Sequence, residues 1–224
     1  MSTTVLWLLC MGVPLAMGLW AQMKVKRTFA RWSSVRVRNG MTGAQAAAEV
    51  VRASGLPDVE IRFVEGRLSD HYDPRSRTLN LSADVGQASS VAALGVAAHE
   101  AGHAIQDARN YTPMRIRQTL VPAATIGQSL WFIPVVLGLL MGITGLVNVG
   151  LILFAAIVLF QLVTLPVEFD ASRRALVALG DGGLLTSEEL GGAKQVLSAA
   201  AWTYVAAFVA AVAQLIYFIL ASRR

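Results

Sequence analysis

Three stretches without charged side chains constrain the fold of this chain most. Residues 1–23, 118–167 and 195–222 contain no Asp, Glu, Lys or Arg. A helix needs about 20 apolar residues to cross the hydrocarbon core of a bilayer, so these stretches have room for one, two and one membrane spans. Only 15% of the residues are charged, against roughly 25% in soluble domains. The sequence therefore predicts a mainly α-helical membrane protein with about four transmembrane helices.

The polar residues between these stretches divide the chain into five segments. We predict spans at about residues 4–23, 124–143, 147–167 and 199–220. The expected segments are an N-terminal transmembrane anchor at 1–23, an α+β domain at 24–120, a transmembrane hairpin at 121–167, a connector at 168–198 and a C-terminal transmembrane helix at 199–224. No basic region precedes the first span, which favours an anchor over a cleaved signal peptide.

Basic residues next to the predicted spans indicate the orientation in the membrane. They follow the first span or precede the second: Lys24, Lys26, Arg27, Arg31, Arg36, Arg38, Arg115 and Arg117. Because positively charged flanks stay in the cytoplasm, we expect the α+β domain and the connector to be cytoplasmic. The membrane explains these charges without a nucleic-acid partner. We expect a multi-pass protein of the bacterial inner (cytoplasmic) membrane, with the lipid bilayer as a partner.

Alternating side chains in the polar domain predict strands. Residues 59–64 and 78–82 alternate apolar and polar side chains, which is the period of a strand. Turn-forming residues at 70–75 lie between them. We therefore expect a hairpin or a pair of short strands. An extended substrate could bind to the second strand as an added strand. The candidate residues for this pairing are Leu79, Asn80 and Leu81.

Capping residues predict two helices in the same domain. Thr42 is a candidate N-cap for a helix that runs to about Ser54. Ser89 or Ser90 is a candidate N-cap for a second helix that runs to about Arg109. The second helix contains a pentapeptide that is typical of metal sites.

The pentapeptide His99-Glu100-Ala101-Gly102-His103 places two imidazoles and a carboxylate on one helical turn. Histidines at this spacing point to the same side of a helix and can bind one metal ion. The carboxylate between them can deprotonate a metal-bound water and pass the proton to a leaving amine. The motif predicts one Zn²⁺ bound by His99 and His103, with Glu100 as the catalytic residue of a hydrolase.

A zinc hydrolase needs a third protein ligand and an open position for water. A third histidine six residues after the second is excluded, because residue 109 is Arg. Glu168 is the leading candidate, since it follows the third span on the predicted cytoplasmic side, and Asp170 is the alternative. His71 lies in the turn-rich segment, where it is a surface residue or stabilises an oxyanion. Ligand histidines also need an acceptor for their second ring nitrogen, and Asp107 or Asp170 could serve.

Two longer runs carry a resemblance to a known family. The runs Ala97–Gln106 and Leu165–Ala175, together with Asp70–Pro74, resemble the YugP family of membrane-bound neutral zinc metallopeptidases. More distantly, the chain is similar to the HtpX and CAAX-prenyl endopeptidase group. The resemblance implies a small α+β, gluzincin-like zinc-peptidase domain at the membrane surface. It also implies a zinc metalloendopeptidase, which cleaves peptides. Placement at the membrane, and not the resemblance, suggests membrane proteins or their tails as substrates.

The same resemblance implies roles for individual residues. It implies that His99 and His103 bind the metal, that Glu100 is the catalytic carboxylate and that Glu168 is the third ligand. The distant group has an Asp four residues after the third-ligand Glu, and this chain has Ser172 there. Asp170 or Asp107 could take over the task of that Asp.

Two other functions compete with a surface peptidase. A site-2-type intramembrane protease carries the same pentapeptide inside a spanning helix. Here Gln106, Asp107 and Arg109 follow it closely, which disfavours burial in lipid, and the predicted spans contain no Asp. A non-catalytic membrane metal-binding or scaffold protein could use the same ligands, and the sequence does not distinguish it from an enzyme.

Overall fold

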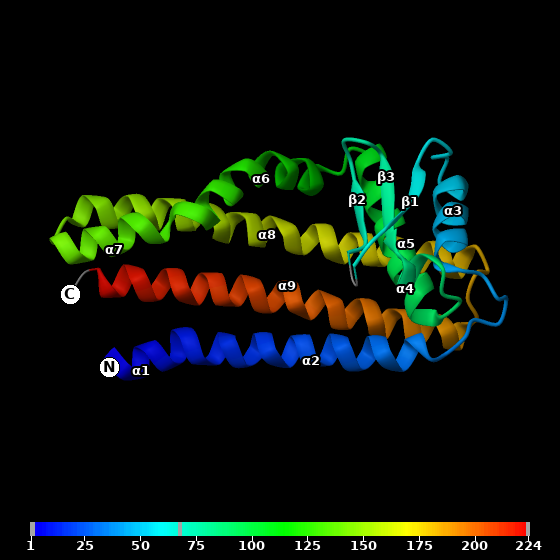
Figure 1. The fold of residues 1–224 in the computed structure, drawn as a ribbon, viewed down its shortest axis with the longest axis horizontal. Helices are drawn as coiled ribbons and strands as arrows, with labels where there is room; N and C mark the ends of the chain where they lie inside the picture. Colours follow the sequence, from blue (N-terminus) through cyan, green and yellow to red (C-terminus); the bar gives the residue numbers. More distant parts are fainter. Residues whose placement is uncertain (1–2, 67–68, 223–224) are drawn as a thin grey trace. The chain divides into compact units, whose positions relative to one another are not determined.

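A computed structural model describes residues 3–66 and 69–222 (Figure 1). The chain divides into two compact units, which we call the helical unit and the mixed unit. The helical unit contains residues 1–22, 113–166 and 202–224, and the mixed unit contains residues 23–112 and 167–201. Several helices contribute residues to both units.

Apolar helices make up the helical unit. Its elements are α1 (Thr3–Trp7), the π-helical turn η1 (Leu8–Gly12), the start of α2 (Val13–Ser33), α6 (Thr112–Leu130), α7 (Phe132–Met141), most of α8 (Thr144–Asp181) and the end of α9 (Ser187–Ala221). Among the described residues, Val5–Ser33, α8 and α9 are each long and apolar enough to cross a membrane. The pair α6 and α7, bent by 41°, gives a fourth candidate span. The mainly α-helical membrane fold is confirmed.

The helices extend well beyond the predicted spans. The first continues to Ser33, α8 continues to Asp181, and α9 begins at Ser187. The connector expected at 168–198 is therefore almost entirely helical, with a break only at residues 182–186. Hydropathy marks where an apolar surface ends, whereas a helix continues until its backbone is capped. Here Gly183, with a φ of 63°, follows the end of α8.

A tight turn joins α7 to α8, close to the predicted break in the hairpin. Gly142 caps α7 in the left-handed conformation, with a φ of 69°. The two helices pack closely, because a Cβ on Gly150 would lie 2.7 Å from the carbonyl oxygen of Trp131. Small residues allow this approach of backbones, as they do in membrane helices generally.

A three-stranded sheet lies in the mixed unit, in the order β1-β3-β2 (Figure 1). Its strands are β1 (Glu60–Val64), β2 (His71–Asp73) and β3 (Thr78–Ser82). β1 pairs with β3 in parallel and β2 pairs with β3 antiparallel. Of the two predicted alternatives, a hairpin of residues 59–64 with 78–82 is wrong because these strands are parallel, whereas a pair of short strands is present. The hairpin joins β2 to β3 instead, so part of the segment predicted as a turn is itself a strand.

The central position of β3 corrects one prediction. Leu79, Asn80 and Leu81 cannot accept an added substrate strand, because β3 is hydrogen-bonded to neighbours on both sides. The side chains of Leu79 and Leu81 are fully buried. Apolar alternation identified a strand in contact with the core, but it carries no information on strand order, which long-range pairing decides.

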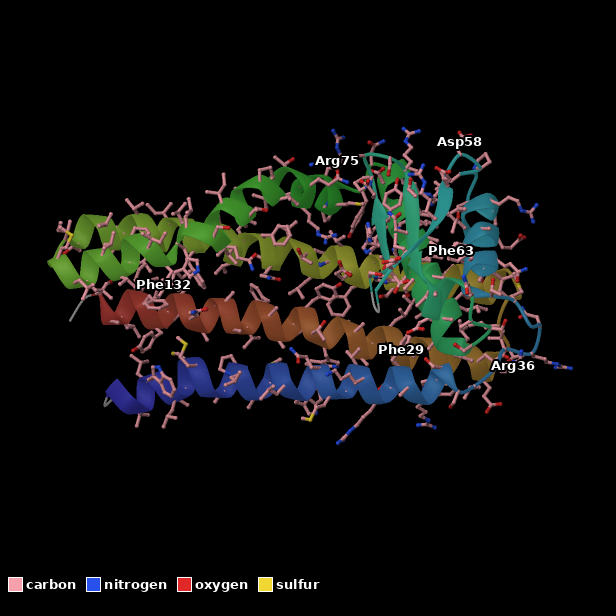
Figure 2. All side chains as sticks on the ribbon, viewed as in Figure 1. Phe29, Arg36, Asp58, Phe63, Arg75 and Phe132 are labelled. Atoms are coloured by element: carbon pink, nitrogen blue, oxygen red, sulfur yellow. The ribbon has the colours of Figure 1, made fainter. Side chains whose placement is uncertain are left out.

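Helices pack against this sheet and begin where the capping residues predict. Thr42 forms a capping box with Gln45 at the start of α3 (Gly43–Ala53). Ser90 caps α5 (Val91–Ala108), since its hydroxyl accepts a hydrogen bond from the N–H of Ala93. The short helix α4 (Ala83–Gly86) precedes α5. Phe63 of β1, labelled in Figure 2, lies so close to α4 that a Cβ on Gly86 would be 2.6 Å from its ring.

Helix α5 is buried on nearly all sides and forms the centre of the mixed unit. It packs against α3, α4, β2 and β3. It also approaches α8 closely, because a Cβ on Gly102 would lie 2.5 Å from the carbonyl oxygen of Ala171. The glycine inside the pentapeptide therefore lets the backbone of α8 come next to the two histidines.

Candidate metal centre

The spacing of the two histidines on α5 brings their rings together. The ring centroids of His99 and His103 are 4.8 Å apart and the ring planes are nearly perpendicular. His103 is 7% exposed, whereas His99 is partly accessible. One side of the histidine pair is thus enclosed, and the other remains open.

Helix α8 adds a carboxylate to this pair. The Oε2 atom of Glu168 lies 3.2 Å from Nε2 of His99 and 3.7 Å from Nε2 of His103. One ligand atom from each of the three residues lies within 4.8 Å of the other two. Tetrahedral zinc with ligand bonds of about 2.0–2.2 Å separates its donor atoms by roughly 3.3–3.6 Å. The donor set and its spacing therefore fit a zinc ion.

Each histidine has a partner for its second ring nitrogen. Nδ1 of His99 is 3.1 Å from Oγ of Ser172, and Nδ1 of His103 is 3.0 Å from Oε1 of Gln106. Both Nε2 atoms remain directed at Glu168. Such partners orient ligand rings and increase their basicity. Ser172, which stands where the resemblance led us to look for an Asp, thus contacts His99 itself.

The catalytic candidate Glu100 is buried beside the edge of the sheet. It is 8% exposed, and its Oε2 accepts a hydrogen bond of 3.0 Å from the backbone N–H of Tyr72 in β2. The hydroxyl of Tyr72 donates to Oδ2 of Asp107 at 3.0 Å. Burial, followed by the contact with Asp107, raises the pKa of Tyr72 well above its ordinary value, so the hydroxyl stays protonated and remains a donor.

Opposing effects act on the imidazole of His103. Burial alone would lower its pKa, since it disfavours the charged ring. The hydrogen bond and charge of Glu168, together with the charge of Glu100, outweigh burial and raise the pKa of His103. The two carboxylates therefore favour a positive charge at this position, which a proton or a metal cation can supply.

Comparisons with known proteins agree with this geometry. A family model described as "putative neutral zinc metallopeptidase" matches residues 7–223. The chain is 40% identical over 206 residues to the "putative membrane protease YugP" of Bacillus subtilis (strain 168), and the match covers 92% of each chain. This chain belongs to the neutral zinc metallopeptidase family. No solved structure matches the chain.

Within this family assignment, the structure brings together His99, His103 and Glu168, which the sequence predicts as ligands. Asp170 is connected to His103 through Gln106, because its Oδ2 accepts from Nε2 of Gln106 at 3.0 Å and Oε1 of Gln106 contacts Nδ1 of His103. Asp107 binds the Tyr72 hydroxyl and not a histidine, so its predicted contact with a ligand ring is wrong.

His71 lies outside the three-residue group, on the exposed face of β2. Its Nδ1 is 2.8 Å from the carbonyl oxygen of Ser69, and its Nε2 is 3.2 Å from the side-chain amide of Asn80, its cross-strand partner. A carbonyl oxygen only accepts, so Nδ1 carries the hydrogen and Nε2 accepts from the amide. An oxyanion contact by His71 remains a prediction, and it would require one of these bonds to be released.

Sequence reasoning missed Gln106, which contacts both His103 and α8. The signal was its position three residues after His103, which places it on the same face of the helix. A glutamine at this spacing is common on helices, so the spacing alone does not reveal a role.

Proposed function

We propose that this protein hydrolyses peptide bonds with a water bound to one zinc ion, which His99, His103 and Glu168 hold. The observation that carries the proposal is the position of Glu168 Oε2, 3.2 Å and 3.7 Å from the two Nε2 atoms. When bound, zinc would lower the pKa of its water and polarise the substrate carbonyl. The partial exposure of His99 leaves a side from which water and substrate can enter.

In this proposal Glu100 acts as general base and then as general acid. It takes the proton of the attacking water and delivers it to the leaving amine. The N–H of Tyr72 holds one carboxylate oxygen, so the other oxygen can face the water. A single backbone donor fixes the orientation of the carboxylate without neutralising it.

An extended substrate would bind to β2 and not to β3. β2 is an edge strand, and the N–H of Tyr72 points toward Glu100. Backbone pairing with an edge strand can hold a peptide in an extended conformation. We infer that the outer edge of β2 positions the scissile bond next to Glu100, with the exposed His71 nearby.

The membrane-spanning helices suggest where the substrates come from. Positive residues flank the predicted first span, so we propose that the active site faces the cytoplasm. Proximity to the bilayer favours membrane proteins or their tails as substrates. A protease of the site-2 type is disfavoured, because α5 is not among the described helices that are apolar and long enough to span a membrane.

The decisive experiment compares the wild type with Glu100→Gln in the purified full-length protein. The variant should bind zinc with unchanged stoichiometry and lose about 10²–10⁴-fold in peptide cleavage, the typical contribution of a general base. Cleavage by the wild type should stop on chelation and return with zinc. A zinc-loaded wild type that cleaves no peptide or membrane-protein substrate would instead favour the non-catalytic metal-binding scaffold.

A further inference from the structure

Gln106 joins the two helices that carry the proposed metal ligands. Its side chain is fully buried. Its Oε1 is 3.0 Å from Nδ1 of His103 on α5. Its Nε2 is 2.8 Å from the carbonyl oxygen of Val167 and 3.0 Å from Oδ2 of Asp170, both on α8. One amide thus connects a histidine of α5 to the turn of α8 that carries Glu168.

The hydrogen bonds to α8 determine which way the amide of Gln106 faces. A backbone carbonyl oxygen and an ionised carboxylate accept hydrogen bonds and do not donate them. The amide nitrogen must therefore face Val167 and Asp170, where it donates both of its hydrogens. The amide oxygen is left for His103, and the opposite orientation would leave two acceptors facing each other in a buried place.

This orientation fixes the protonation of one ring nitrogen. The oxygen of Gln106 only accepts, so Nδ1 of His103 must carry a hydrogen. In the neutral ring the lone pair then lies on Nε2, the nitrogen directed at Glu168. A metal ion requires that lone pair. Gln106 therefore selects the tautomer in which His103 can act as a ligand.

The contact to His99 does not impose such a choice. The hydroxyl of Ser172 can either donate or accept, so its contact with Nδ1 of His99 is compatible with both tautomers. The two ligand rings are thus held in different ways, and the fixed one is the more deeply buried.

Two arginines hold the far end of this network. Arg173 and Arg174 both form ion pairs with Asp170. These contacts keep the carboxylate charged and in place, which maintains it as an acceptor for the amide of Gln106. The network runs from Arg174 through Asp170 and Gln106 to His103, and each bond in it has one possible direction.

We propose that Gln106 is a positioning residue that holds His103 in the Nδ1-protonated tautomer and so sets the metal affinity of the site. This inference rests on the proposed zinc site. A partner of this kind contributes about 10–100-fold to metal affinity. Its loss should weaken zinc binding by that factor and free the ring to take either tautomer.

The test uses the full-length protein, three variants of the network and one control variant. Gln106→Met removes both hydrogen-bonding groups and keeps the length of the side chain. Gln106→Glu keeps an acceptor for His103 but places an acceptor against both Asp170 and the carbonyl oxygen of Val167. Adding Asp170→Asn to that variant restores a donor for the first of these contacts and should recover part of the lost affinity. Gln195→Met is the control for the same substitution at an exposed position, since Gln195 accepts from Trp32 in the same unit and has no contact with the site.

Two readouts other than activity are measured. Zinc affinity, from competition with a chelator, should fall about 10–100-fold in Gln106→Met and stay unchanged in Gln195→Met. The protein contains three histidines, so ¹⁵N-histidine labelling and cadmium loading should resolve the coordinating nitrogen of each ligand. His103 should be protonated at Nδ1 in the wild type and in Gln106→Glu, but not uniformly so in Gln106→Met.

The outcomes separate this inference from the proposed function. If the wild type binds no zinc, the proposed function fails. If it binds zinc and Gln106→Met retains wild-type affinity and tautomer, only the role of Gln106 is overturned. If Gln106→Met does not fold, the comparison of Gln106→Glu with the double variant Gln106→Glu/Asp170→Asn decides. The network is contradicted if Gln106→Glu loses zinc affinity and the added Asp170→Asn recovers none of it.

Discussion

The backbone N–H of Tyr72 donates to Oε2 of Glu100 at 3.0 Å, so the edge strand of the sheet directly holds the carboxylate of the pentapeptide. The Tyr72 side chain makes a second connection to the same helix through Asp107. Strand β2 is therefore connected to α5 by two hydrogen bonds, and different substitutions of Tyr72 remove one or the other.

Replacing Tyr72 should distinguish these two connections. Tyr72→Phe removes the hydroxyl but keeps the N–H, so activity should be nearly unchanged and stability should fall by about 1 kcal/mol, the usual net value of one hydrogen bond. Tyr72→Pro removes the N–H, and an edge strand tolerates proline. It should lower kcat well below that of Tyr72→Ala, which keeps the N–H. Equal kcat values for the Pro and Ala variants would show that the bond to Glu100 is dispensable.

Glu168 should contribute more to metal binding than Asp170. Glu168→Ala removes an oxygen that lies within 3.7 Å of both histidine Nε2 atoms. It should weaken zinc binding by more than the roughly 100-fold that a partner outside the ligand set can cost. Asp170→Asn retains an acceptor oxygen for Gln106 and should have a much smaller effect. Metal analysis and chelator competition measure both, and the reverse ranking would make Asp170 the third ligand.

Zinc affinity should depend on pH over a range set by His103. The carboxylates raise the pKa of His103 in the metal-free protein above its ordinary value, which is about 6.5. A proton on the ring competes with zinc. Affinity should therefore be full above the raised pKa and should fall about tenfold per pH unit below it, as expected for one displaced proton.

Chelator competition between about pH 5.5 and 9, a range that includes the ordinary histidine pKa and extends further above it than below it, measures this dependence. Glu168→Gln is the control, since it removes a carboxylate charge that raises the pKa of His103. Its affinity should be lower throughout, and its decline should begin at a lower pH. An affinity in the wild type that begins to fall only below pH 6.5 or so would contradict the assigned sign.

Gly102 should be required for the close approach of α5 and α8. A Cβ there would lie 2.5 Å from the carbonyl oxygen of Ala171, so Gly102→Ala must push the helices apart. Overpacking of this kind costs about 1–3 kcal/mol, and it should also weaken zinc binding, because Glu168 lies on α8. Gly191→Ala in α9 meets no atom within 4 Å and should be neutral or stabilising. Thermal unfolding with and without zinc tests both variants.

Local chemistry made much of this fold predictable. The capping residues Thr42 and Ser90 mark the starts of α3 and α5 because their side chains satisfy the first backbone N–H groups. Uncharged stretches mark the candidate spans because a helix needs about 20 consecutive apolar residues to cross a bilayer. The pairing of Glu168 with the histidines was predictable from motif and topology together, since both segments were expected on one side of the membrane.

Other features depend on contacts between distant residues, and the sequence does not reveal them. The strand β2 was read as a turn because His71–Asp73 is short and its neighbours favour turns. The strand order places β3 at the centre of the sheet, so a substrate strand cannot pair with it. The role of Gln106 depends on contacts with α8, because two of its three partners, Val167 and Asp170, are distant in sequence.

The mixed unit is discontinuous in sequence, and this affects how the enzyme can be dissected. Residues 23–112 include His99, Glu100 and His103, whereas Glu168 and Ser172 come from residues 167–201. A fragment cut from the first stretch alone would keep the pentapeptide yet lack Glu168, one of the three proposed metal ligands. Recombinant work on this peptidase must therefore preserve the intervening hydrophobic hairpin or replace it with a linker.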